Sequence, residues 1–300
     1  LESRNISDGR IPPDKGIGRV LKLNEGKLFG IRGQEYFILN KNDRDLKLER
    51  IPVTAPATGI LTITSDPYNR IWGSSNFGQT IFCYNTDDGE YWNSSAVTNN
   101  GGEVYGMRWA EGKLFMSCYA GGDHVVYESE KPWDQINNIN PKTLKSVAPE
   151  LIRPHAKSII GPDGAFWTGW TARYGVYGGG LSRVDTRTLE VDSWYDPVPG
   201  QNIESLAAGD KYLYFTTNGW GNGLPEKVEP FYLCVWDPNG RIVWKMKFSE
   251  GEKPGKIGII GSYGLISIND EIRVFDCRSM EFINTIKVGG HCSCIIEYNE

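Results

Sequence analysis

Short apolar runs of four to six residues, separated by polar turns, recur along the chain. One kind of run follows a turn and contains aromatic and branched residues. Its examples are 26–31, 70–74, 112–116, 164–168, 211–215 and 263–267. The other kind mostly ends in Asn or Asp, and its examples are 36–40, 81–85, 125–128, 181–185, 233–237 and 272–276. Apolar runs this short, bounded by turn residues, predict β-strands.

The runs of the second kind end 45, 43, 57, 52 and 39 residues apart. A period near 45 residues, with four short strands in each unit, is typical of one blade of a β-propeller. A single four-stranded sheet cannot bury both of its faces, whereas sheets packed face to face around an axis can. We therefore predict an all-β protein, a closed ring of four-stranded antiparallel blades in a single domain over residues 1–300.

The repeat also gives the expected limits of the blades. They cover 17–52, 58–98, 103–149, 154–198, 202–248 and 256–288, and residues 291–298 start a seventh blade. A seven-bladed ring with an incomplete last blade is favoured, and a six-bladed ring is the alternative. The one short helical segment predicted lies at 131–139, after Pro132-Trp133-Asp134.

Composition and charge exclude several classes of partner. The net charge of −5 is spread over the chain without a run of like charges, which argues against nucleic acid. No apolar stretch of about 18 residues occurs, so no membrane partner is expected. The first residues contain no apolar segment of signal-peptide type. No motif indicates a cofactor.

The six cysteines are not spaced like a disulfide scaffold. Four of them, Cys83, Cys118, Cys234 and Cys277, fall within predicted strands, where a free thiol acts as a small apolar side chain. This favours a reducing compartment such as the cytoplasm. Cys292, Cys294 and the adjacent His291 could together bind a metal, but buried reduced thiols are the favoured interpretation, so no metal site is predicted.

Five short segments carry a resemblance to a known family: Tyr119–Gly122, Lys131–Asp134, Arg153–Pro154, Gly161–Gly164 and Tyr174–Leu181. With them, the region 114–187 resembles the streptogramin-lyase-like and gluconolactonase-like propellers. The resemblance covers about a quarter of the chain in detail. It implies a propeller fold, and it is compatible with carbohydrate lyases of this kind, in which His or Tyr transfers protons and an Arg lies near the sugar carboxylate. It assigns no catalytic residue.

The topology of a blade predicts which loops share a face. With strands A to D counted outward from the axis, the B–C loops and the connections from D to the next blade emerge together. Two B–C loops are long, at about 170–180 and 218–230, whereas that of the first blade is Gly33-Gln34. Long insertions on one side of a repeat array are typical of its binding face.

The residues that we expect to catalyse the reaction or bind the ligand lie on that face. The predicted catalytic residues are His155, Tyr177, Arg173 and His124, and the predicted ligand-binding residues are Tyr119, Arg153, Trp170, Tyr174, Trp220 and Asn222. Asp123 and His291 are expected at the same level. An arginine fork suits a carboxylate, aromatic rings suit a sugar, and His or Tyr can transfer a proton. Each residue also has a structural alternative, as a packing or hydrogen-bonding residue of the blades.

Two functions remain open from the sequence. The first is a lyase that performs β-elimination on a uronate-containing glycan or a related anionic ligand at the long-loop face. The second is a propeller that binds a small molecule or glycan without turnover. A scaffold for protein partners is less favoured, because no Gly-His and Trp-Asp repeat signature recurs. The lyase is the leading hypothesis.

Overall fold

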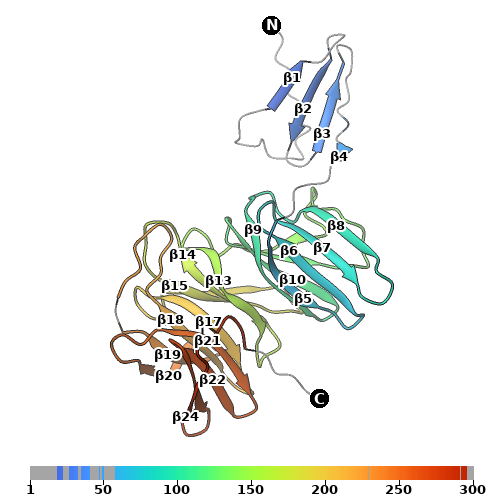
Figure 1. The fold of residues 1–300 in the computed structure, drawn as a ribbon. Coiled ribbons are helices and arrows are strands. Elements are labelled where there is room, and N and C mark those ends of the chain that lie inside the picture. Colours follow the sequence, from blue (N-terminus) through green and yellow to red (C-terminus); the bar gives the residue numbers. More distant parts are fainter. Residues whose placement is uncertain are drawn as a thin grey trace.

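A computed structural model describes residues 19–22, 27–32, 35–40, 47, 49–50, 58–228, 230–290 and 292–295. These residues form six four-stranded sheets, and each sheet is built from four strands that are consecutive in the chain. All neighbouring strands within a sheet are antiparallel. Figure 1 shows the sheet of β1 to β4 apart from the other five.

The first three sheets have these strands. The first contains β1 (Arg19–Lys22), β2 (Leu28–Arg32), β3 (Glu35–Leu39) and β4 (Glu49–Arg50). The second contains β5 (Ile60–Ser65), β6 (Arg70–Ser75), β7 (Thr80–Asn85) and β8 (Tyr91–Ala96). The third contains β9 (Glu103–Ala110), β10 (Lys113–Tyr119), β11 (Asp123–Tyr127) and β12 (Lys142–Thr143).

The remaining three sheets follow the same order. The fourth contains β13 (Leu151–Ile160), β14 (Phe166–Ala172), β15 (Gly179–Val184) and β16 (Val191–Tyr195). The fifth contains β17 (Asn202–Ala208), β18 (Leu213–Asn218), β19 (Tyr232–Asp237) and β20 (Arg241–Lys247). The sixth contains β21 (Pro254–Ile260), β22 (Tyr263–Ile268), β23 (Glu271–Asp276) and β24 (Glu281–Lys287).

The strands predicted from the apolar runs are all present, and each overlaps the second or third strand of its sheet. The predicted helix at 131–139 is wrong. This segment is a turn closed by a bridge between Asp134 and Asn140. The side-chain amide of Asn140 donates to the carbonyl groups of Glu128, Lys131 and Pro132, which holds the backbone in a non-helical path. The single domain, the blade limits and the closure of the ring stay predictions.

The core lies between successive sheets. The middle strands are the most buried in the third, fourth and fifth sheets, and every residue of β11 and of β14 is buried. One apolar cluster, which includes Trp167, Ile203 and Phe215, joins the fourth and fifth sheets. Similar clusters join the second sheet to the third, the third to the fourth and the fifth to the sixth. The innermost strands β5, β9, β13, β17 and β21 therefore lie side by side in chain order.

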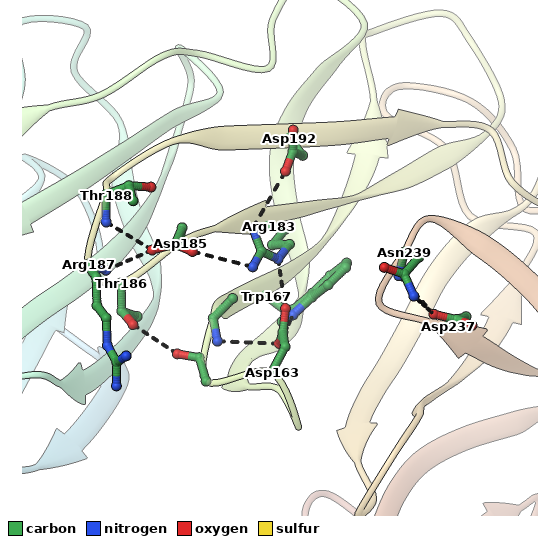
Figure 2. Close-up of polar contacts among 12 residues, drawn as sticks. Asp163, Trp167, Arg183, Asp185, Thr186, Arg187, Thr188, Asp192, Asp237 and Asn239 are labelled. Atoms are coloured by element: carbon green, nitrogen blue, oxygen red, sulfur yellow. Dashed lines mark hydrogen bonds and ion pairs between the residues drawn. The ribbon is translucent and has the colours of Figure 1, made fainter.

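Polar anchors at the strand turns complete this packing, and Figure 2 shows one in the fourth sheet. Asp163 accepts the indole N–H of Trp167 at 2.9 Å and the Nε–H of Arg183 at 2.7 Å. Arg183 also lies 3.6 Å from the exposed Asp192. Asp66 of the second sheet accepts Trp72 at 2.8 Å and Arg70 at 2.6 Å in the same way. In two separate sheets, a carboxylate at a strand turn thus accepts the indole N–H of a buried tryptophan.

We expect Asp163→Ala to lower the free energy of unfolding by about 2 kcal/mol, because it leaves the buried indole N–H of Trp167 without an acceptor. Asp192→Ala is the matched control, since it removes another carboxylate beside Arg183. An exposed ion pair of this kind contributes about 0.5 kcal/mol or less. Urea unfolding measures both. Equal losses in the two variants would contradict the anchoring role of Asp163.

Candidate functional site

Residues from four consecutive sheets meet where the long loops leave the fourth and fifth sheets. The innermost strands bring Tyr105 on β9, Arg153 and His155 on β13, Glu204 on β17 and Lys256 on β21. The loop between β14 and β15 brings Tyr174, and the loop between β18 and β19 brings Trp220. Two connected groups result, an arginine cluster and a histidine pair.

The arginine cluster consists of Tyr105, Tyr119, Arg153 and Tyr174. Arg153 donates to the hydroxyl groups of Tyr105 at 2.6 Å and Tyr174 at 2.9 Å. Its guanidinium carbon lies 4.1 Å from the centre of the Tyr119 ring, a cation–π contact. The hydroxyl groups of Tyr119 and Tyr174 are 2.8 Å apart. The cluster therefore joins the innermost strand of the fourth sheet to the end of β10.

In the part of the chain that the structure describes, the guanidinium group of Arg153 contacts phenols and no carboxylate. Among the residues that the structure describes, no Asp or Glu lies within ion-pair distance of it, and its hydrogen-bond and cation–π partners are tyrosines. Its buried Nε also has no hydrogen-bond partner there. A half-buried cation without a counter-ion is an electrostatic site for an anion.

Tyr174 is the most acidic phenol of the arginine cluster. Its oxygen accepts the hydrogen bond from Tyr119, and this lowers its pKa below the usual value; burial opposes the shift, and Arg153 adds to it. The same hydrogen bond raises the pKa of Tyr119, because Tyr119 is the donor. Tyr174 is 55% exposed, so a ligand can reach it. It is suited to give a proton to a ligand oxygen.

The histidine pair consists of His155 and Glu204. Nε2 of His155 lies 3.1 Å from Oε2 of Glu204. The ring of Trp220 stacks on the imidazole at 5.1 Å with an interplanar angle of 26°. A quarter of the His155 side chain is exposed. The imidazole is thus held by one carboxylate and one indole while it stays in reach of solvent.

The ionisation state of Glu204 determines which nitrogen of the His155 imidazole donates the hydrogen bond between them. Burial would raise its pKa, but the hydrogen bond from His155 and the charge of Lys256 outweigh this and lower the pKa to about 2. An ionised carboxylate can only accept hydrogen bonds. Nε2 of His155 is therefore the donor, and Nδ1 of the neutral ring carries the lone pair.

The two long loops pack on each other and hold Tyr174 and Trp220 in place. The backbone N–H of Gly175 donates to the carbonyl of Asn222 at 3.0 Å. The side chain of Asn222 donates to the carbonyl of Ala172 at 2.6 Å. Tyr177 donates to the carbonyl of Pro225 at 2.8 Å. Each loop therefore positions one group of the site and stabilises the other loop.

The structure brings together five of the ten predicted site residues: Tyr119, Arg153, His155, Tyr174 and Trp220. Two others lie beside the site without joining it. Tyr177 and Asn222 brace the loops, and Asn222 is only 1% exposed. Arg173 is exposed, and no ion pair of its side chain is found among the described residues. His291 lies outside the described residues.

The predicted roles of His124 and Trp170 are wrong, because both side chains are buried in the core. They are 1% and 0% exposed. The Ser182 hydroxyl accepts the indole N–H of Trp170 at 2.6 Å and lies 2.8 Å from Nε2 of His124. The two rings pack edge to face. Both β11 and β14 are buried on their two faces, so alternate residues do not return to solvent.

Three residues of the site were not predicted: Tyr105, Glu204 and Lys256. Each lies on the innermost strand of its sheet, among apolar neighbours. No local motif marks them. Aligning the innermost strands of the repeat with one another would have shown a polar residue in the middle of an apolar run in each.

Among the described residues, no three His, Cys, Asp or Glu side chains are grouped to hold a metal ion. In that same part of the chain, no helix is long and apolar enough to cross a membrane. Hollows of about 230 Å³ and 200 Å³ lie elsewhere, one beside Phe231 and Lys253 and one beside Tyr212 and Cys277.

Comparison with solved structures identifies the fold. A streptogramin B lyase is 14% identical and superposes with a TM-score of 0.57 over 93% of this chain and 85% of its own. A catalytically inactive virginiamycin B lyase from Staphylococcus aureus, with quinupristin, is 16% identical with a TM-score of 0.51, over 86% and 79% of the two chains. The nidogen/laminin complex gives 10% identity and a TM-score of 0.51, over 87% and 93%. No family model and no curated protein sequence matches the chain.

These likenesses confirm a β-propeller fold, and they confirm at the level of fold the resemblance to streptogramin-lyase-like propellers. The fold is shared by lyases and by propellers that bind other proteins. At such low identity it assigns neither a reaction nor a substrate.

We expect the buried His124 to make stability depend on pH. Burial lowers its pKa from 6.5 to about 4, so the unfolded chain binds this proton more readily than the folded one. The stabilisation present above pH 6.5 is therefore lost as the pH falls toward 4, by about 2 kcal/mol between pH 7 and pH 5. Urea unfolding at both pH values measures it. His124→Gln should remove this part of the pH dependence, and an unchanged dependence in the variant would exclude His124 as its source.

Proposed function

We propose that this propeller is a lyase that performs β-elimination on a uronate-containing glycan or a related anionic ligand at the long-loop face. The observation that carries the proposal is the arrangement on β13. Arg153, a cation without a counter-ion, stands two residues before His155, an imidazole that its glutamate partner leaves with a free Nδ1.

Arg153 supplies the first requirement of the reaction, which is binding of the substrate carboxylate. The neighbouring tyrosines occupy part of its donor set, and the remaining N–H groups suit a carboxylate fork. Neutralising the carboxylate makes the adjacent C–H more acidic, because the carbanion that forms on proton loss spreads its charge onto the carboxylate.

His155 then removes the proton from this carbon. Nδ1 takes the proton, while the Nε2–H group stays hydrogen-bonded to the Glu204 carboxylate. The carboxylate stabilises the imidazolium that forms. The electron pair of the broken C–H bond becomes the new C=C bond. Trp220 covers one face of the ring and keeps its orientation.

Tyr174 completes the elimination at the leaving oxygen. As the C–O bond breaks, its electron pair goes to the oxygen, and the Tyr174 hydroxyl supplies the proton. The phenolate left behind is stabilised by the hydrogen bonds from Tyr119 and Arg153. Solvent carries the proton from His155 back to Tyr174, so the protein is unchanged after each turnover.

A screen of uronate polysaccharides, read by the ultraviolet absorbance of the unsaturated product, tests the proposal. We expect turnover by the wild-type protein and a loss of about 100-fold or more in kcat for His155→Ala and Arg153→Met. Arg173→Met is the matched control, because its guanidinium lies outside the arginine cluster, and it should keep the wild-type rate. Absence of product from every polysaccharide, or wild-type turnover by His155→Ala, would refute the lyase.

The second candidate is a propeller that binds an anionic glycan without converting it. The arginine cluster favours it, since carboxylate binding by Arg153 needs no base. Calorimetric titration separates the two functions. Binding that is lost in Arg153→Met and kept in His155→Ala, with no product formed, would identify a binding protein.

A further inference from the structure

Glu204 is held from both sides by residues of neighbouring sheets. Nζ of Lys256, on β21, lies 2.6 Å from Oε1, whereas Nε2 of His155, on β13, lies 3.1 Å from Oε2. The side-chain amide of Asn218 also donates to Oε2. Three consecutive innermost strands thus form one line of contacts from lysine through glutamate to histidine.

The glutamate needs this arrangement because little of it meets water. Its side chain is 15% exposed, and a buried carboxylate stays ionised only where charges and donors compensate for lost hydration. Lys256 is the one permanent cation in contact with it among the described residues. Lys256 itself is a third exposed and reaches no ligand-binding residue of the arginine cluster.

The geometry points to Lys256 as a positioning residue of the site: its ammonium group holds the Glu204 carboxylate on Nε2 of His155, and so leaves Nδ1 as the basic atom. Lys256 touches neither the imidazole nor the expected substrate position. It acts through Glu204 in two ways, by fixing the orientation of the carboxylate and by balancing its charge.

The charge balance matters because an uncompensated carboxylate would hold a second proton on the imidazole. The charged groups around the ring are Glu204, which contacts it, and Lys256, which contacts Glu204; Arg153 lies two residues away on the same strand. Trp220 contributes a neutral contact to the ring, and Asn218 contributes one to the Glu204 carboxylate. With Lys256 in place, the glutamate orients the ring through Nε2, and its charge is balanced.

Nitrogen-15 NMR of the imidazole groups tests the structural part without any substrate. The chain has only three histidines, so His155→Gln identifies the signals. We expect the wild-type ring to carry its proton on Nε2. Glu204→Gln should give a mixture of the two tautomers, because an amide can donate as well as accept.

Lys256→Met should move the pH at which the His155 signals change upward by about one unit, because the carboxylate loses its compensating charge. Lys256→Arg keeps a cation at this position and should behave as the wild type. A wild-type ring with its proton on Nδ1, or signals that Lys256→Met leaves unmoved, would overturn the inference. Urea unfolding of each variant shows that it is folded.

The kinetic consequence rests on the proposed function. In Lys256→Met the acid limb of the pH profile of kcat/KM should move to higher pH by the same amount, about one pH unit. The value of kcat at high pH should be retained. If no substrate is turned over, the proposed function fails while the NMR result still decides the role of Lys256. If turnover needs His155 but the proton is on Nδ1, this inference fails and the lyase stands.

Discussion

The central strands of the third, fourth and fifth sheets are buried on both faces, and the rest of the structure depends on covering them. Strand β14 is buried at every position, and β10 and β18 are buried at nearly every one. A four-stranded sheet cannot hide such strands by itself, and the third, fourth and fifth sheets each pack between two neighbours. This packing brings the innermost strands of successive sheets side by side, and it fixes which residues can meet between them.

The candidate site follows from the same packing. Polar side chains on adjacent innermost strands come within hydrogen-bonding distance of one another, as His155, Glu204 and Lys256 do. Their desolvation is offset by mutual contacts, whereas the side chains that contact Arg153 among the described residues are phenols. The arginine cluster and the histidine pair therefore differ: among the described residues the cation of the first contacts no carboxylate, whereas the imidazole of the second contacts Glu204.

Much of the fold could be predicted from the sequence, because the period of the strands and the residues of the turns are local signals. The long loops were also predictable, and in the structure they bring Tyr174 to Arg153 and Trp220 to His155. Burial was not. His124 and Trp170 lie in strands covered on both sides, where the usual alternation of exposed and buried residues fails. Glu204 was missed because its partners come from other sheets, at sequence distances of about 50 residues.

The line from Lys256 to His155 crosses two interfaces between sheets, and no single sheet contains it. A small rotation of the fifth sheet against the fourth would separate the imidazole from its carboxylate while leaving every strand intact. Heat or mild denaturant that loosens this interface would then break the contact between His155 and Glu204, while the circular-dichroism spectrum of the strands is still that of the native protein. The integrity of the site therefore depends on the packing between the sheets.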